Sequence, residues 1–124
     1  MIAGVGIDII EIERIAENIM KENGFRELVF SKNEIAYCEN KANKFEHYAA
    51  RFAAKEAFFK AIGTGWLGDT AFNEVEVVND QYGKPGIVFL GVTNTTISAM
   101  HITNIQVSLT HIKTTAAAVV IIEK

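Results

Sequence analysis

The sequence has few of the features that mark secreted, membrane-spanning or nucleic-acid-binding proteins. Cys38 is the single cysteine among 124 residues, so no internal disulfide can form and a reducing, cytoplasmic compartment is expected. No apolar run approaches the roughly 18 residues of a membrane span, and the N-terminus lacks the basic and apolar regions of a signal peptide. The net charge of −3 provides no basic excess, which argues against general nucleic-acid binding.

Several catalytic motifs are missing as well. The chain contains no HExxH, no paired CxxC and no GxxxxGK[ST] segment, so neither zinc chemistry nor P-loop chemistry is supported. Gly4-Val-Gly6 lacks the third glycine of a dinucleotide-binding motif. No histidine pattern accompanies Cys38, which is therefore expected to be a structural thiol.

Apolar residues, in contrast, are abundant. They make up 49% of the chain and include eight phenylalanines. A chain of this length is expected to form one domain, residues 1–124, with a small core. The apolar excess suggests that part of the surface is covered by another subunit.

The pattern of apolar residues predicts an α+β fold, with helices mainly in the first half and an antiparallel-rich sheet built from the N-terminal strand and the second half. Gly24 is expected to close the first helix, and the turn residues 79–85 are expected to join two strands as a hairpin. The predicted strands are 1–10, 72–78, 86–90, 105–110 and 115–122, and the predicted helices are 12–24, 25–30, 31–39, 43–62 and 93–101.

The helix over residues 43–62 is predicted to be the centre of the protein. At 100° per residue, an aromatic stripe that includes Phe52 and Phe59 faces the core. Glu56 and Lys60 lie on or beside that stripe, where an unpaired charge is costly. The alternative interpretation is an ordinary i,i+4 ion pair between these two residues.

The end of this helix is predicted to lie near the candidate functional site. Gly63 is expected to be the C′ residue, and the backbone N–H groups of residues 63–65 are expected to be free for a ligand.

Lys55 borders the aromatic stripe on its other side. Residues 41–60 contain five basic and two acidic side chains, a local charge of +3, whereas residues 1–40 contain four basic and eight acidic side chains, or −4. This local positive charge suits a polyanionic small molecule.

Asp8 is the second carboxylate whose position suggests a function. Strand alternation places it on one face with Gly4 and Gly6, which leaves an open patch. The alternative is an acid that interacts with the N-terminus of the following helix. With water and substrate oxygens, Asp8 and Glu56 would form a plausible Mg²⁺ site. His111, at a predicted strand end, is a candidate phosphate ligand or a structural residue.

Residues 4–15 read GVGIDIIEIERI, and residues 51–65 read RFAAKEAFFKAIGTG. These two segments resemble the holo-acyl-carrier-protein synthase family of small phosphopantetheinyl transferases. The later segments 83–85 (GKP) and 108–111 (SLTH) match further landmarks of the family. The resemblance extends over the whole chain with matching order and length.

The resemblance implies a function. The family transfers the 4′-phosphopantetheine group from coenzyme A to a serine of apo acyl carrier protein, in fatty acid biosynthesis and lipid metabolism, and releases adenosine 3′,5′-bisphosphate. Asp8 and Glu56 match the acids that hold Mg²⁺, and Lys60 matches the lysine near the reacting phosphate. Whether Lys60 acts as a general base or only as a charge is left open. The positions that match nucleotide and phosphate contacts are Arg51, Lys55, Gly63, Lys84 and His111.

The resemblance also implies protein partners. Family members of this size are homotrimers with active sites between neighbouring subunits, and their first helix offers basic residues to the acidic carrier protein. The corresponding docking residues here are Arg14, Lys21, Phe25 and Arg26, although Glu13, Glu17 and Glu22 dilute the positive charge.

Three other functions fit parts of the pattern. A coenzyme A- or nucleotide-binding module would keep the fold without the chemistry. A metal-dependent phosphoesterase would use the same acids with water as nucleophile. A purely structural trimer would leave the positive charge around the central helix unexplained.

Overall fold

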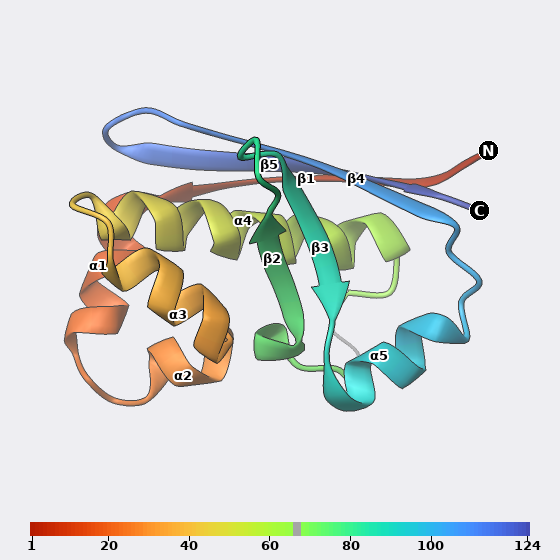
Figure 1. Cartoon of the computed structure of the whole chain (residues 1–124), viewed down its shortest axis with the longest axis horizontal. Coiled ribbons are helices and arrows are strands. Elements are labelled where there is room, and N and C mark those ends of the chain that lie inside the picture. The colour runs from red at the N-terminus through yellow and green to blue at the C-terminus, as the bar shows by residue number, and fades with distance from the viewer. Residues whose placement is uncertain (66–67) are drawn as a thin grey trace.

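The computed structural model describes residues 1–65 and 68–124. Residues 66–67, between the predicted helix 43–62 and the predicted strand 72–78, lie outside the described residues. The long helix α4 (Lys44–Ile62) runs beneath a three-stranded antiparallel sheet of order β1-β5-β4 (Figure 1). Its strands are β1 (Ile2–Glu11), β5 (Thr115–Glu123) and β4 (Asn104–His111). The almost wholly apolar strand β5 is the central one.

The other elements pack on the parts of α4 that this sheet leaves uncovered, and a hairpin crosses in front of α4 and reaches β4 (Figure 1). Three short helices lie toward one end, and a two-stranded hairpin and a fifth helix lie farther along. These elements are α1 (Ile12–Met20), α2 (Phe25–Val29), α3 (Lys32–Glu39), the antiparallel pair β2 (Val75–Asn79) and β3 (Pro85–Phe89), and α5 (Gly91–Ser98). The predicted α+β class is confirmed. None of the described helices combines the length and apolarity needed to cross a membrane.

Helix α4 is buried on two faces because both layers pack against it. Its aromatic face carries Tyr48 and Phe59, which are buried as predicted, while Phe52 is half-buried. Its alanine face, which includes Ala57 and Ala61, is buried as well and packs against β1 and β5. The prediction of a single core-facing stripe was therefore too narrow.

Gly4 and Gly6 allow β1 to approach α4 at backbone distance. A Cβ atom at Gly6 would lie 1.8 Å from the carbonyl oxygen of Ala57, and one at Gly4 would lie 1.9 Å from that of Ala61. No side chain fits in either position. The open patch predicted on this face of the strand is thus filled by the backbone of α4, and the space for a ligand begins only at Asp8.

Three element boundaries differ from the prediction by three residues or more: the end of α1, the start of β2, and the end of α5, which is Ser98 instead of residue 101. Helix α1 ends at Met20, and Gly24 does not close it but precedes α2 with a φ of 92°. The chain already turns at Glu22, whose φ is 52°, so the helix cannot continue to Gly24. Residues Phe72–Glu74 form a 3₁₀ turn rather than the first part of β2.

Local capping explains why α3 begins where the sequence predicted. The Ser31 side chain accepts a hydrogen bond from the Glu34 backbone N–H, and the Glu34 carboxylate accepts one from the Ser31 N–H. Cys38 of the same helix is fully buried, and burial raises the pKa of its thiol to about 12. The expectation of a structural thiol is confirmed.

The glycine contacts give a stability prediction. Gly6→Ala is expected to lower the free energy of unfolding by more than about 3 kcal/mol, because the new methyl group overlaps the backbone of α4. Gly68→Ala is the matched control, since no atom of the described residues lies within 4 Å of the added carbon there. Urea unfolding of both variants measures the difference, and equal stabilities would contradict the packing described.

Candidate functional site

Asp8 lies on β1 on the face that is turned toward α4, two residues after Gly6. Its side chain is 16% exposed, and its Oδ1 accepts a hydrogen bond from Lys60 Nζ at 3.0 Å. Lys60 Nζ also donates to the carbonyl oxygen of Ile7 at 3.0 Å. The fold therefore brings together two of the predicted site residues, which are 52 positions apart in the chain.

Glu56 lies beside this pair, one helical turn before Lys60. Asp8 and Glu56 line the same cavity of about 480 Å³. Burial raises the pKa of Glu56, the negative charge of Asp8 raises it further, and the positive charge of Lys60 opposes both effects. Two carboxylates that repel each other in a partly buried cavity favour a bound cation.

The chemistry of the donor set limits which metal fits this position. Across residues 1–65 and 68–124, no group of three or more His, Cys, Asp or Glu side chains is arranged to hold an ion. Zinc sites generally need three or four protein ligands. Mg²⁺ is commonly held by one or two carboxylates and completes its shell with water and phosphate oxygens, so Asp8 and Glu56 suit it.

Phe52, Phe25 and Arg14 line the same cavity. The Phe52 ring stacks on Phe72 with a centroid distance of 6.3 Å and lies 6.4 Å from the ring of Phe25. One wall of the cavity is therefore aromatic, and the carboxylates lie beside it. The helical periodicity predicted that Phe52 lies in the core and did not reveal its half-buried position beside Glu56.

The end of α4 differs from the prediction in one respect. Gly63 has a φ of 80°, as a C-terminal glycine should. Its N–H donates to the carbonyl oxygen of Lys60 at 3.1 Å. This N–H is therefore not free for a ligand, because it caps the helix.

Lys55 is not available to a ligand either, which corrects the prediction that it contacts the nucleotide. Its side chain is fully buried. Its Nζ donates to Glu34 Oε1 at 2.6 Å and to the carbonyl oxygens of Phe72 and Val75, each at 2.7 Å. Burial lowers the pKa of Lys55, and the Glu34 carboxylate opposes that effect. All three ammonium protons have acceptors, so this lysine joins α4 to α3 and β2.

Arg51 is also buried, with 2% of its surface exposed. One guanidinium nitrogen donates to Asn79 Oδ1 at 2.6 Å, and the guanidinium carbon lies 4.2 Å from the centre of the Tyr37 ring. Asn79 Nδ2 in turn donates to the carbonyl oxygen of Gly83 at 3.0 Å. Arg51 therefore supports the turn that carries Lys84, a role that the sequence analysis missed.

Lys84 is exposed in the turn of the β2–β3 hairpin. Asp80 holds this turn, because its Oδ1 accepts hydrogen bonds from the N–H groups of Tyr82 at 2.8 Å and Lys84 at 2.9 Å. Gly83 adopts a φ of 82°, which favours glycine at that position. The GKP segment is thus a rigid turn that presents a lysine to solvent.

His111 lies at the end of β4, next to the start of α4. Its Nε2 is 3.1 Å from Glu46 Oε2, and its side chain is 43% exposed. Glu46 and Glu56 are ten residues apart in one helix, so His111 lies about 15 Å along α4 from the carboxylate site. A single chain does not bring His111 and Lys60 together.

The four predicted docking residues lie on α1, on α2 and between them. Arg14 and Lys21 are exposed and Phe25 is half-buried. Arg26 is bound by Glu27 and by Glu39 of α3, two partners that the sequence analysis did not identify. Phe25 lines the carboxylate cavity and also a second cavity next to Arg26, so the two cavities are neighbours that share this residue.

Comparisons with known proteins agree on one family. The model of the 4′-phosphopantetheinyl transferase superfamily matches residues 4–119. A holo-[acyl-carrier-protein] synthase from Cytophaga hutchinsonii is 47% identical, with 100% of this chain and 99% of the relative covered.

Solved structures agree as well. The crystal structure of the holo-[acyl-carrier-protein] synthase from Neisseria meningitidis superimposes with a TM-score of 0.92, at 30% identity and with both chains fully covered. That of a holo-(acyl-carrier-protein) synthase from Bacillus anthracis, in complex with CoA (3′,5′-ADP), gives a TM-score of 0.81 at 36% identity and covers 99% of this chain and 97% of the other.

The two lysines of α4 provide a test of the assignments above. Lys55→Met is expected to destabilise the protein by about 3–5 kcal/mol, because it leaves Glu34 buried and without its cation. Lys60→Met removes a half-exposed charge and should cost less than about 1 kcal/mol. Chemical denaturation measures the free energy of unfolding of both variants. A similar decrease in the two variants would refute the structural role of Lys55.

Proposed function

The chain belongs to the holo-[acyl-carrier-protein] synthase family, within the 4′-phosphopantetheinyl transferase superfamily, and from this membership we propose its reaction. The enzyme transfers the 4′-phosphopantetheine group from coenzyme A to a serine of apo acyl carrier protein and releases adenosine 3′,5′-bisphosphate. The observation that carries the proposal is that Asp8 and Glu56 line one cavity and that Lys60 binds Asp8 beside it. Residues 1–124 act as one catalytic domain in cytoplasmic fatty acid biosynthesis.

Asp8 and Glu56 hold Mg²⁺ in this proposal. When bound, the ion neutralises charge on the pyrophosphate oxygens and orients the leaving group. The two carboxylates would supply two oxygen ligands, and water and phosphate oxygens would supply the others. The repulsion between Asp8 and Glu56 supports the presence of a cation.

Lys60 acts next to the reacting phosphate. The serine oxygen attacks the β-phosphorus of coenzyme A as the P–O bond to adenosine 3′,5′-bisphosphate breaks, and the serine proton must leave. Neutral Lys60 would accept that proton at Nζ. Charged Lys60 would stabilise the phosphoryl oxygens, and the proton would pass to solvent. Its present bonds to Asp8 and Ile7 fix its position for either role.

The remaining phosphate contacts are assigned to residues away from the carboxylates. Lys84 and His111 are exposed, and His111 is proposed to bind the 3′-phosphate of coenzyme A. Arg51 acts through Asn79 on the turn that carries Lys84. Gly63 contributes by ending α4 next to the site. The distance along α4 between His111 and Glu56 supports an active site that uses residues from two subunits.

The outer face of the three-stranded sheet supports a homotrimer. Val5, Ile7 and Ile9 are 59%, 67% and 69% exposed and form an apolar row along β1. Ile7 and Val5 are paired with Val119 and Ile121 of β5, whose side chains continue the row. A contiguous apolar surface of this kind indicates a protein interface.

Arg14, Lys21, Phe25 and Arg26 are proposed to bind the carrier protein. Arg14 and Phe25 line the cavity that contains Asp8 and Glu56. A carrier protein over α1 and α2 would therefore place its serine next to the carboxylates.

The reaction is tested by intact mass of apo acyl carrier protein after incubation with the enzyme, coenzyme A and Mg²⁺. We expect a gain of one phosphopantetheine, with at least a roughly 100-fold lower rate for Glu56→Gln and for a chelator control. Coenzyme A binding without transfer would instead indicate a binding module. Coenzyme A hydrolysis without carrier would indicate a phosphoesterase, and full activity of Glu56→Gln would refute the metal site.

The assembly is tested by light scattering. Ile7→Lys places a charge in the apolar row and is expected to convert the trimer to monomers. Val92→Lys on α5 is the matched control, since Val92 is 62% exposed but lies away from the sheet. A wild-type monomer, or a trimer that survives Ile7→Lys, would contradict the proposed interface.

A further inference from the structure

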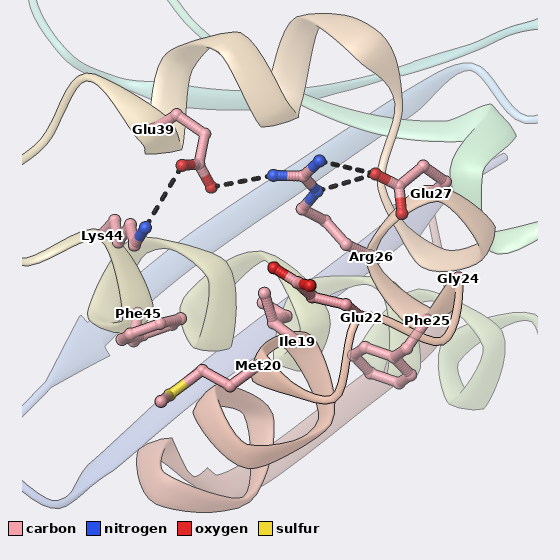
Figure 2. A pocket seen from close by; sticks show the side chains of 10 residues that line it. All are labelled: Ile19, Met20, Glu22, Gly24, Phe25, Arg26, Glu27, Glu39, Lys44 and Phe45. Atoms are coloured by element: carbon pink, nitrogen blue, oxygen red, sulfur yellow. Dashed lines mark hydrogen bonds and ion pairs between the residues drawn. The ribbon is translucent and has the colours of Figure 1, made fainter.

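A cavity of about 470 Å³ lies between the α1–α2 connection, α2 and the facing ends of α3 and α4 (Figure 2). Arg26 extends across it. The side chains that line it are mostly polar or charged, with Ile19, Met20, Phe25 and Phe45 as the apolar part. The cavity has three acids, Glu22, Glu27 and Glu39, and two bases, Arg26 and Lys44.

The Arg26 guanidinium is held from two sides by carboxylates (Figure 2). Nε and one terminal nitrogen bind Glu27 Oε2 at 2.8 and 2.7 Å, and the other terminal nitrogen binds Glu39 Oε2 at 3.3 Å. Arg26 is nevertheless 36% exposed, so a partner protein can reach it. We call Arg26, Glu27 and Glu39 the arginine clamp.

The two carboxylates of the clamp are not equivalent. Glu39 is one-third exposed and also accepts hydrogen bonds from Tyr48 at 2.6 Å and Lys44 at 3.2 Å. Glu27 is 58% exposed, and Arg26 is the only side chain that the described residues give its carboxylate as a partner. Glu39 is therefore fixed to α4, whereas Glu27 can exchange its bond at little cost.

The clamp lies next to the site of the proposed reaction. Phe25 precedes Arg26 in the chain and lines both this cavity and the one with Asp8 and Glu56. A macromolecule that delivers a serine to Asp8 and Glu56 would extend over Arg26. The guanidinium already has the geometry that binds carboxylates.

We propose that Glu27 occupies the position on Arg26 that a carboxylate of the carrier protein takes when it docks, while Glu39 keeps the guanidinium oriented. This inference rests on the proposed function. It makes Glu27 a competitor and Glu39 a positioning residue, and together they set the affinity for the carrier. The clamp also explains why the proposed carrier-binding face contains acidic residues. Glu27 competes with the carboxylate of the partner, so a partner that fits poorly dissociates.

The test measures kcat and KM for apo acyl carrier protein. Glu27→Gln is expected to lower this KM roughly two- to fivefold, the effect of freeing an arginine from an exposed ion pair, with the KM for coenzyme A unchanged. Glu39→Gln should raise the KM for the carrier, because Arg26 loses its fixed support. Glu22→Gln is the matched control, since Glu22 lines the same cavity but has no bond to Arg26 among the described contacts.

Arg26→Gln distinguishes the clamp from a general charge effect. Arg26→Gln should raise the KM for the carrier. The double variant Arg26→Gln/Glu27→Gln should have the same KM as Arg26→Gln alone. The proposal would be overturned if the KM for the carrier fell equally in Glu22→Gln, Glu27→Gln and Glu39→Gln. An unchanged or raised KM for the carrier in Glu27→Gln would overturn it as well. Unfolding curves of each variant confirm that it is folded.

The experiment distinguishes a failure of the proposed function from a failure of the arginine clamp alone. A wild-type enzyme that transfers no phosphopantetheine refutes the proposed function, and the clamp as a carrier site is refuted with it. A wild-type enzyme that transfers the group, with a KM insensitive to Glu27, refutes the clamp alone.

Discussion

The close packing of β1 on α4 is the constraint on which the site depends. Gly4 and Gly6 leave no side chain between strand and helix, and Asp8 follows on the same face because side chains alternate along a strand. Asp8 therefore points at α4, where Lys60 binds it and Glu56 lies beside it. A bulkier residue at Gly6 would move the strand away from the helix and separate the two carboxylates of the proposed Mg²⁺ site.

The opposite side of α4 is fixed by Lys55. Its ammonium binds one carboxylate and two backbone carbonyl groups from three other elements. Lys55 and Glu56 are adjacent in the chain but point into different environments, because successive helical residues are rotated by about 100°. One of them holds the helix in place, and the other faces the cavity.

The sequence predicted the elements well where the pattern is local. The alternation of β1, the capping box at Ser31 and the glycine after α4 each specify their own element. The roles of charged residues were predicted less well, because an ion pair such as Lys55–Glu34 joins positions 21 apart, and periodicity does not reveal which distant acid meets a lysine. The same reason explains why the sequence did not reveal that Glu39, on another helix, binds Arg26.

The buried thiol of Cys38 has a consequence for an enzyme whose proposed substrate is itself a thiol. Coenzyme A forms disulfides, and these exchange only with a thiolate that can reach them. Cys38 is enclosed between α3 and α4 and keeps its proton at neutral pH. Because the chain has no other cysteine, the folded protein presents no group that would form a mixed disulfide with oxidised coenzyme A, even without a reductant.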